Sequence, residues 1–315
     1  MTTVASLDRD SSREARLGVI CGLAAYLVWG FFPIFFKLVS QVPPLEVVAH
    51  RVVWSMVFLT ILVTVKGRWG DLRAAFGTHK TLATLCATTV LIATNWLVFI
   101  YAIGKGEVLQ SSLGYFMTPL VNIVLGFVFL HERMKRGQAI GVMLAVVGLT
   151  LSALRLGTIP WIALGLAATF GLYGLLRKTV PVDSLVGLSV ETFLAGPAAA
   201  IYLGYLGATG QGTFLAGSLG DSTVLLLSGV VTAIPLLIFT AAAKRLRLMT
   251  IGFLQYITPS IHFLLAVCLY GEEFNATHLV TFLCVWSGLA VYSWSAIAFA
   301  RKPAVASARM ETAAE

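Results

Sequence analysis

Residues 111–134 read SSLGYFMTPLVNIVLGFVFLHERM, and residues 250–273 read TIGFLQYITPSIHFLLAVCLYGEE. A shift of 140 positions places Thr118-Pro119 on Thr258-Pro259 and Glu132 on Glu272. The same shift aligns further positions along the chain: Leu45 with Leu185, Arg51 with Glu191, Asn95 with Pro235, and Gly148-Leu149 with Gly288-Leu289. One constant offset over about a hundred residues indicates an internal duplication.

The composition around these two stretches is that of a membrane protein. Of the 315 residues, 58% are hydrophobic and 11% are charged, and the mean hydropathy is +0.89. A soluble domain carries roughly 25% charged residues, which cover its water-facing surface. So few charges cannot cover the surface of a chain this long. The composition therefore predicts a multi-pass membrane protein that is surrounded mostly by lipid.

The spans themselves can be read from the apolar runs. A helix needs about 20 apolar residues to cross the roughly 30 Å of hydrocarbon in a bilayer. Ten runs approach that length, and we predict one transmembrane helix for each of them: 17–39, 46–65, 81–103, 107–130, 137–154, 159–177, 186–206, 221–243, 248–270 and 277–299.

The basic residues set the orientation of these spans. With the N-terminus in the cytoplasm, 18 of the 22 lysines and arginines fall on the cytoplasmic side. Three fall on the outer side (Lys37, Lys105 and Arg155), and Arg51 lies within a span. The positive-inside rule therefore predicts that both termini are cytoplasmic. The net charge of +8 comes from these short connections and tails rather than from one basic patch, so we expect no nucleic-acid partner.

The duplication and the number of spans together predict the architecture. Each copy holds five spans, an odd number, so the second copy must enter the membrane upside down. We predict an all-α membrane protein of ten transmembrane helices in two inverted five-helix repeats, 17–155 and 156–300, between cytoplasmic tails at 1–16 and 301–315. Secondary transporters with inverted repeats bind their substrate near the midplane, where the repeats meet. A duplicated bundle that serves as a scaffold or sensor is the alternative.

Several stretches of the chain resemble a known family. These are GLAAYLVWGFFPIFFKLV (22–39), HRVVWS (50–55), NWLVFIYA (95–102), SLGYFMTPLVNIVLGFVFLHER (112–133), YGLLRK (173–178), ETFL (191–194), IPLLIFTAAAKRLRL (234–248) and GFLQYITP (252–259). They are similar to the RarD branch of the EamA family, within the drug/metabolite transporter superfamily. The resemblance covers the whole chain except its two tails.

The resemblance implies a function as well as a fold. It implies a bacterial inner-membrane carrier with ten helices in two inverted five-helix repeats. Members of the branch are labelled chloramphenicol-sensitive proteins or chloramphenicol permeases, a label that does not define a natural substrate. Relatives in the superfamily export amino acids and other metabolites, so export is the favoured direction. The implied partners are a small organic solute and the lipid bilayer.

Charged residues inside the spans are candidates for function, because each costs about 2.5–3.5 kcal/mol to insert at a helix centre. Arg51 and Glu191 each lie about five residues inside a span, roughly 8 Å deep, but from opposite faces of the membrane. We therefore expect no contact between them, and expect Glu191 to pair with Arg177 or Lys178. The predicted gate or charge-coupling set is Arg51, Glu191, Lys37 and Arg177. Structural ion pairs or snorkelling side chains are the alternative.

Polar and aromatic residues cluster at the middle level of the spans. Pro119 and Pro259 lie there at repeat-related positions, and each frees a backbone carbonyl one turn earlier, which favours bends in helices that line a cavity. The predicted cavity lining is Tyr26, Trp29, Asn95, Trp96, Tyr115, Asn122, Tyr173, Gln255, Tyr256 and His262. Interhelical hydrogen bonding is the alternative for each of them. Proton coupling through His262 or Glu191 is a further hypothesis.

Enzymatic functions are poorly supported. His131-Glu132 begins HERMK and lacks the second histidine of a zinc HExxH motif, and no phosphate-binding Walker loop is present. The four cysteines lie inside apolar runs at spacings that match neither a metal site nor a disulfide framework. We therefore expect no catalytic site, metal or cofactor. The predicted function is secondary transport of a small metabolite or drug by alternating access. The alternatives are a channel and a non-transporting scaffold or sensor, and the oligomeric state stays undefined.

Overall fold

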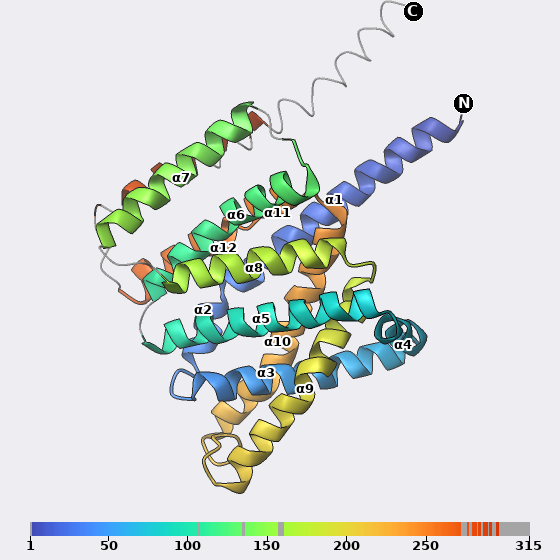
Figure 1. Ribbon diagram of the computed structural model, residues 1–315. Helices are drawn as coiled ribbons and strands as arrows, with labels where there is room; N and C mark the ends of the chain where they lie inside the picture. Colours follow the sequence, from blue (N-terminus) through green and yellow to red (C-terminus); the bar gives the residue numbers. More distant parts are fainter. Residues whose placement is uncertain are drawn as a thin grey trace, which may run out of the picture. The chain divides into compact units, whose positions relative to one another are not determined.

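The structure is a computed structural model that describes residues 2–105, 108–133, 136–156 and 161–271, together with part of the residues between 276 and 295. Within these ranges it is helical and contains no strand. Figure 1 shows the helices, which in chain order are α1 (Thr2–Gly30), α2 (Phe32–Lys37), α3 (Pro44–Val65), α4 (Trp69–Gly77), α5 (His79–Lys105), α6 (Val108–Leu130), α7 (Arg136–Leu156), α8 (Trp161–Thr179), α9 (Ser184–Ala208), α10 (Leu219–Arg245), α11 (Leu248–Leu254), α12 (Ile257–Leu264) and the π-helical turn η1 (Leu265–Leu269).

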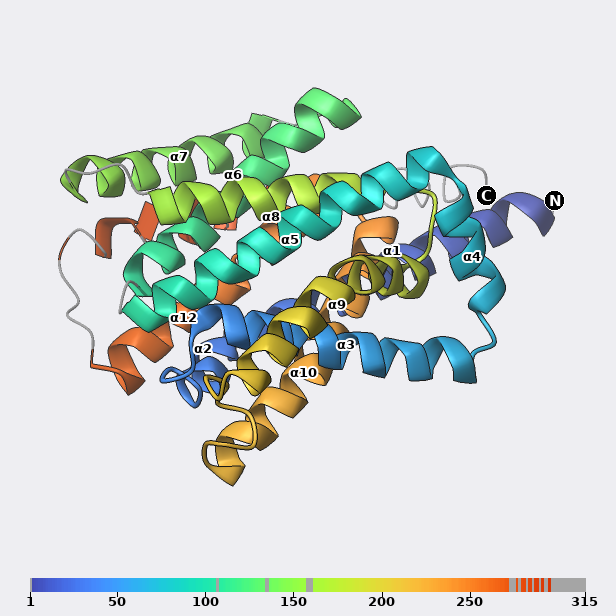
Figure 2. The same ribbon diagram turned by 60° about the horizontal axis from the view of Figure 1, so that its bottom comes forward.

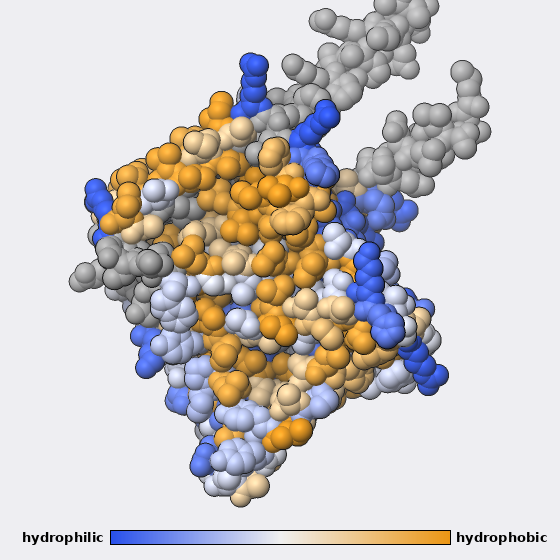
Figure 3. Space-filling model, viewed as in Figure 1, coloured by the Kyte–Doolittle hydropathy of each residue, from blue (hydrophilic) through white to orange (hydrophobic). Residues whose placement is uncertain are grey.

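Among the described residues, seven helical segments are long and apolar enough to cross a membrane. Helices α7 and α8 and the helical residues between 279 and 288 lie at the remaining three predicted spans. Apolar side chains on these helices face outward: Ile61 and Ile201 expose 55% and 74% of their surface. On the face drawn in Figure 3, hydrophobic residues cover most of the middle and hydrophilic residues gather toward the margins. This distribution suits a chain whose sides are covered by lipid.

The helix boundaries differ from the predicted spans in three places. Helix α1 begins at Thr2, so residues 2–16, expected as a tail, continue the first span as a helix. Helix α4 is a short helix within the connection 66–80, which carried no apolar run to predict it. The predicted spans 17–39 and 248–270 are each interrupted, at Phe31 and at Gln255–Tyr256.

Prolines account for both interruptions. Pro33 lies at the start of α2 and Pro259 lies in the first turn of α12, and neither has an N–H to donate to the carbonyl four residues earlier. After the second interruption, the N–H of Thr258 donates to the Gln255 carbonyl at 3.1 Å, a tighter turn than an α-helix makes.

The described chain divides into two compact units. Residues 1–126 and 161–271 form the first, and residues 127–160 and 272–315 form the second. In the second unit, α7 packs against the helical residues near Thr281, whose hydroxyl donates to the Gly148 carbonyl at 3.4 Å. A Cβ atom at Gly148 would lie 2.6 Å from the Cβ atom of Cys284, so only glycine permits this approach. The predicted division at residues 155–156 follows the repeats, whereas these units cut across them.

The packing of the first unit follows the duplication. Helix α1 packs along α10, and α8 packs along α5; Figures 1 and 2 show α5 beside α8 in both views. The 140-residue shift places the end of α1, together with α2, on α8, and places α5 on α10, so these two contacts are equivalent. Helix α3 packs against α9, which is its own repeat partner. A pseudo-two-fold relation between the halves produces this pattern, with the α3–α9 contact on the axis.

Helices α3 and α10 also cross closely. A Cβ atom at Gly229 would lie 2.3 Å from the backbone carbon of Trp54 and 2.5 Å from the Ser55 nitrogen. The Ser55 hydroxyl donates to the Gly229 carbonyl at 2.9 Å. About one turn along each helix from this crossing, Arg51 and Thr232 face one another, so the glycine positions a polar contact inside the unit.

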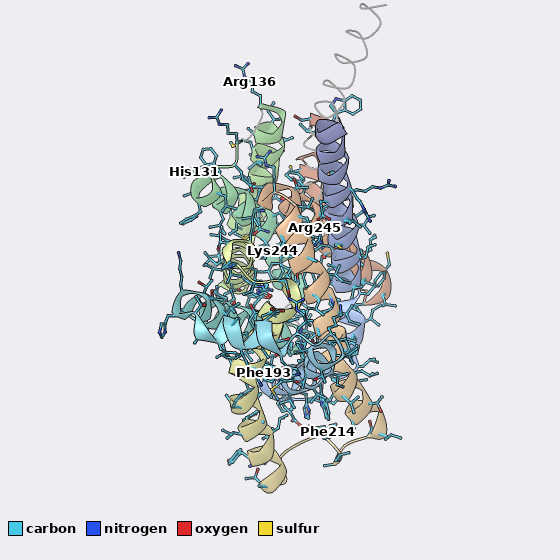
Figure 4. All side chains as sticks on the ribbon, turned by 90° about the vertical axis from the view of Figure 1, so that its right-hand side faces the viewer. His131, Arg136, Phe193, Phe214, Lys244 and Arg245 are labelled. Atoms are coloured by element: carbon cyan, nitrogen blue, oxygen red, sulfur yellow. The ribbon has the colours of Figure 1, made fainter. Side chains whose placement is uncertain are left out.

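Hydrogen bonds and ion pairs tie the connections at each end of the first unit. At one end, called the basic end here, Arg68 pairs with Asp71 and Asp183, and Lys244 donates to the Val180 carbonyl. Lys178 at this end donates to the carbonyls of Ala243 and Leu246. Figure 4 shows Lys244 and Arg245 at this end of α10, with Phe214 beyond its other end.

At the opposite end, two contacts hold the connection between α9 and α10 and the N-terminus of α10. The Glu46 carboxylate accepts from the Thr213 N–H at 2.6 Å and from its hydroxyl at 3.1 Å. The Gln41 amide donates to the Asp221 carboxylate at 2.6 Å. Each end of the unit is therefore closed by its own set of polar contacts.

Candidate functional site

A cavity lies inside the first unit. Eight described helices contribute to its wall, α1, α2, α3, α5, α6, α8, α10 and α12, together with the break between α11 and α12. The lining residues are Tyr26, Trp29, Phe32, Arg51, Asn95, Trp96, Phe99, Tyr115, Phe170, Leu236, Gln255, Thr258 and His262. Seven of the ten residues predicted for the lining are among them, and so is Arg51, which was predicted as a gate.

The walls of this cavity are mainly aromatic. The Trp29 ring centroid lies 5.5 Å from that of Phe170 and 5.4 Å from that of Phe239. On another side, Tyr115 lies 5.5 Å from Phe99 and 5.3 Å from His262, both edge to face. Ligand sites are mostly apolar walls with a few placed polar groups, and this cavity has that composition.

Arg51 supplies the charge of the cavity. The side chain is 2% exposed, and its Nε donates to the Thr232 hydroxyl at 2.9 Å. Its guanidinium carbon lies 4.7 Å from the Phe36 ring centroid and 4.5 Å from that of Trp96. The Nη1 atom is buried without a hydrogen-bond partner among the described residues. The lining contains no aspartate or glutamate, so the cavity carries a positive charge that the described residues leave unneutralised.

At the interruption near Phe31, backbone carbonyls at the end of α1 contact side chains of α12. Pro33 has no N–H to satisfy the Trp29 carbonyl, and His262 Nε2 lies 3.0 Å from that oxygen. Because a carbonyl only accepts, this contact places the ring proton on Nε2. The Thr258 hydroxyl likewise donates to the Tyr26 carbonyl at 2.8 Å. Two residues of α12 therefore fix the end of α1 against it.

Two prolines lie at repeat-related positions beside the cavity. Pro119 and Pro259 each lie four residues after a lining residue, Tyr115 and Gln255, which are repeat partners. Helix α6 stays helical through Pro119, whereas the ninth span is interrupted near Pro259. In both copies, the residue four positions before the proline, whose carbonyl cannot accept the usual α-helical bond from it, belongs to the cavity wall.

Polar residues behind the wall orient those that line it. Asn122, predicted for the lining, lies outside it, and its amide donates to the Gln255 side-chain oxygen at 3.0 Å. The Asn95 amide donates to the Leu166 carbonyl at 3.0 Å and to the Thr169 hydroxyl at 2.8 Å. The Gln255 amide group and the Asn95 oxygen are left as the groups that can meet a ligand.

A buried charged cluster lies between the cavity and the basic end. Glu191 is 3% exposed; it accepts from the Thr88 hydroxyl at 2.6 Å and from the Tyr173 hydroxyl at 3.3 Å. Arg177 Nε lies 3.7 Å from its carboxylate, which is the predicted ion pair. Tyr173 stacks on Phe239 with ring centroids 6.3 Å apart, beneath the aromatic wall. Tyr173 therefore belongs to this cluster rather than to the cavity lining.

The remaining candidates lie elsewhere. Tyr256 is buried beside Phe116 and Phe253 and does not line the cavity. Lys37 is exposed, with its ammonium 5.6 Å from the Tyr270 ring centroid. The structure thus separates the predicted charged set into a cavity residue, Arg51, a buried pair, Glu191 and Arg177, and a surface residue.

One charged contact at the basic end lies outside the spans. Partial burial of Asp183 would raise the pKa of its carboxyl group. The Val186 N–H and the Arg68 guanidinium both stabilise the carboxylate and outweigh that effect, so the pKa of Asp183 is lower than usual. The carboxylate therefore stays charged, and able to bind Arg68, throughout the neutral range.

The residues that the sequence did not single out as site residues are mostly phenylalanines. Phe32, Phe99 and Phe170 line the cavity, but 19 phenylalanines in apolar runs give no signal that separates lining from packing. Glu46 could have been found, because it is an acidic residue at the start of a span and is 1% exposed in the structure.

Comparisons with known proteins agree with this architecture. The sequence profile of the EamA-like transporter family matches residues 16–154, nearly the extent of the first predicted repeat. Protein RarD of Salmonella typhi is 44% identical over 291 residues, which cover 92% of this chain and 99% of that protein. The chloramphenicol-sensitive protein RarD of Pseudomonas aeruginosa is 32% identical over 91% of this chain and 97% of that protein.

A solved structure described as "Crystal structure of protein" has the same fold. It superposes with a TM-score of 0.64 and covers 87% of this chain and 96% of that chain, at 14% sequence identity. At that identity the likeness concerns the fold alone.

Proposed function

This chain belongs to the EamA-like transporter family, in its RarD branch, and from that premise we propose that it is a secondary carrier for a small organic solute. The observation that supports the proposal best is the cavity in the first unit, where aromatic walls surround one buried charge. A membrane scaffold has no need of a buried, charged cavity at the middle of its helices, because such a charge is costly to insert.

The proposed mechanism is alternating access. Between the cavity and the basic end lie the Tyr173–Phe239 stack and the Glu191–Arg177 pair. Toward the opposite end, Phe36 is 3% exposed and packs edge to face on Phe32 and Phe99. Opening one closure while the other stays shut would expose the cavity to one side of the membrane at a time.

The two ends of the unit differ in charge, which supports an orientation. Lys178, Lys244 and Arg68 lie at the basic end, and by the positive-inside rule we assign this end to the cytoplasm of a bacterial inner membrane. Both termini are then cytoplasmic. Export is favoured by the family resemblance.

Two groups are candidates for coupling transport to protons. Glu191 is a buried carboxylate whose counter-ion, Arg177, lies at 3.7 Å, and protonating the carboxylate would break that pair. His262 lines the cavity and would gain a charge beside Arg51 if it were protonated. Glu191 is the better candidate, because a proton there removes a charge rather than placing two like charges in one cavity.

Solute flux into proteoliposomes tests the proposal against its alternatives. Radiolabelled amino acids, small metabolites and chloramphenicol serve as probes. A carrier gives uptake that saturates with concentration and is accelerated by unlabelled solute on the other side. A channel gives flux without that acceleration, and a scaffold or sensor gives none. Flux that never saturates, or an absence of flux for every probe class, contradicts the carrier.

A further inference from the structure

The two charged residues at repeat-related positions have different surroundings. Arg51 and Glu191 are separated by 140 residues and are both almost fully buried. Glu191 is neutralised within the protein by Arg177 at 3.7 Å. Arg51 has a hydroxyl, Thr232, and two aromatic rings around it, and no carboxylate lines its cavity.

A buried arginine without a counter-ion carries a large free-energy cost. The transfer of an unpaired charge into a low-dielectric interior is among the most unfavourable contacts in a protein, and contact with aromatic faces offsets only part of it. In natural protein interiors such a charge is paired with an opposite charge or takes part in function. The Nη1 atom of Arg51, which is buried and lacks a hydrogen-bond partner among the described residues, is the part of the group available to a ligand.

Several uncharged polar groups of the cavity can also donate, although the Asn95 side-chain oxygen, which also lines it, only accepts. The Gln255 side-chain oxygen accepts from Asn122, which leaves its amide N–H groups for a ligand. The Tyr26 hydroxyl is buried without a hydrogen-bond partner within the described residues, and Tyr115 brings a second phenolic hydroxyl to the lining. A cavity that offers an arginine, an amide and two phenolic hydroxyls matches an acceptor-rich group such as a carboxylate.

The rest of the wall fits an aromatic or otherwise flat ligand body. Trp29 and Phe170 face the cavity from one side, and Trp96, Phe99 and Tyr115 from another. Rings arranged in this way stack on a planar ligand, with offset or edge-to-face contacts.

We propose that the cavity binds a small aromatic organic anion, whose carboxylate accepts hydrogen bonds from Arg51 and from the donors around it while its ring packs on the tryptophans. This substrate class rests on the proposed function, because it takes the cavity to be the transport site.

Matched ligands test the class on the unmodified protein. Benzoate, phenylacetate and indole-3-acetate are each compared with the corresponding amide and amine by calorimetry on the purified full-length chain at neutral pH. A charge-assisted hydrogen bond predicts that each acid binds about ten- to a hundredfold more tightly than its amide, with the amine weaker still. Equal affinity for acid and amide, preference for the amine, or no binding by any acid overturns the proposal.

Variants of Arg51 assign the selectivity to that residue. Arg51→Gln should bring the affinity for phenylacetate down to that for phenylacetamide while leaving the amide affinity unchanged. Arg51→Lys should retain part of the preference, because it keeps the charge but loses the planar fork. Lys105→Gln removes a positive charge from the exposed end of α5 and should leave the preference intact. An acid preference that persists in Arg51→Gln contradicts the assignment.

The outcomes for substrate class and for transport can be told apart. Acid-selective binding without saturable flux of phenylacetate would retain the anion site and reject the carrier. Saturable flux of neutral or cationic solutes, without acid-selective binding, would retain the carrier and reject the anion site.

Discussion

At the scale of single residues, Glu191 and Arg177 form an ion pair that is buried inside the spans. Their side chains are 3% and 0% exposed, so neither partner can turn to water if the other is removed. Thr88 and Tyr173 already donate to the carboxylate, which fixes its position. Removing the charge of either residue should therefore cause a large loss of stability.

Glu191→Gln tests this coupling. Removing one partner of a buried ion pair costs about 3–5 kcal/mol, because the other charge is left uncompensated. We expect a strongly lowered melting temperature for Glu191→Gln and for Arg177→Gln, and a partial recovery in the double variant. The measurement is thermal unfolding of the detergent-purified chain. Additive losses in the double variant would show that the two residues act independently.

Asp183 gives a prediction that depends on pH. Its folded pKa is lowered, so its contribution to stability is complete above the unfolded pKa of about 3.9 and is lost as the pH falls through the folded value. Asp183→Asn keeps a good helix cap but removes the charge that binds Arg68.

The wild type should therefore exceed Asp183→Asn in stability by up to about 1 kcal/mol near neutral pH. This difference should shrink as the pH falls below about 3.9 and be lost once the carboxyl group is protonated in the folded chain. Unfolding by denaturant at several pH values measures it. A difference that grew toward acid would contradict the assigned direction.

At the scale of helices, the crossing of α3 and α10 depends on Gly229. The atoms that a Cβ would meet there belong to the backbone of Trp54 and Ser55, which cannot move aside. Gly229→Ala should destabilise the chain by about 1–3 kcal/mol, as overpacked positions do, and should weaken ligand binding by shifting Arg51.

Gly165→Ala is the matched control, because no atom lies within 4 Å of the position its Cβ would take. There the better helix propensity of alanine should leave stability unchanged or raise it slightly. Thermal unfolding compares the two variants. Equal effects at both positions would mean that the crossing is looser than the structure indicates.

The connection between α9 and α10 provides a second prediction at this scale. Glu46 holds Thr213 through two hydrogen bonds, and the neighbouring Phe214 packs on His50 with ring centroids 4.8 Å apart. Glu46→Gln replaces charge-assisted bonds by weaker neutral ones, so the connection should open about ten times more often.

The readout is the rate at which a cysteine at Phe214 reacts with a maleimide, in a chain without its native cysteines. Glu14→Gln is the control, since Glu14 pairs with Arg245 at the basic end, 2.8 Å away. It should leave the rate unchanged. If the rate in Glu46→Gln is also unchanged, Glu46 does not hold the connection between α9 and α10 in place.

The helices also show which features a sequence makes predictable. Apolar length located the membrane helices, because hydrocarbon thickness dictates it. The interruption at Phe31 was missed, although Pro33 was present, because a proline near a helix centre is compatible with a bend or a break. Which of the two occurs depends on a tertiary partner, and here His262 satisfies the carbonyl that Pro33 leaves free.

At the scale of the whole molecule, the duplication was the most informative feature for predicting the site. It relates Tyr115 to Gln255, and both residues line the cavity. It could not show that Asn122 lies behind Gln255, or that Tyr173 turns toward Glu191, because those positions depend on side-chain packing between helices. The polar contacts that close each end, such as Gln41 with Asp221, lie in connections where neither hydropathy nor the repeat constrains the structure.

The central claim is that the cavity opens to one side of the membrane at a time, and sided labelling of a cysteine at Thr258 tests it most directly. Histidines at Arg68 and Asp183, bridged by Zn²⁺, would lock the basic end, and histidines at Gln41 and Asp221 would lock the other. In proteoliposomes, a membrane-impermeant maleimide should label the unlocked chain from either side. Each lock should abolish labelling from its own side only. Labelling from both sides despite either lock, or from neither side without locks, would contradict the carrier.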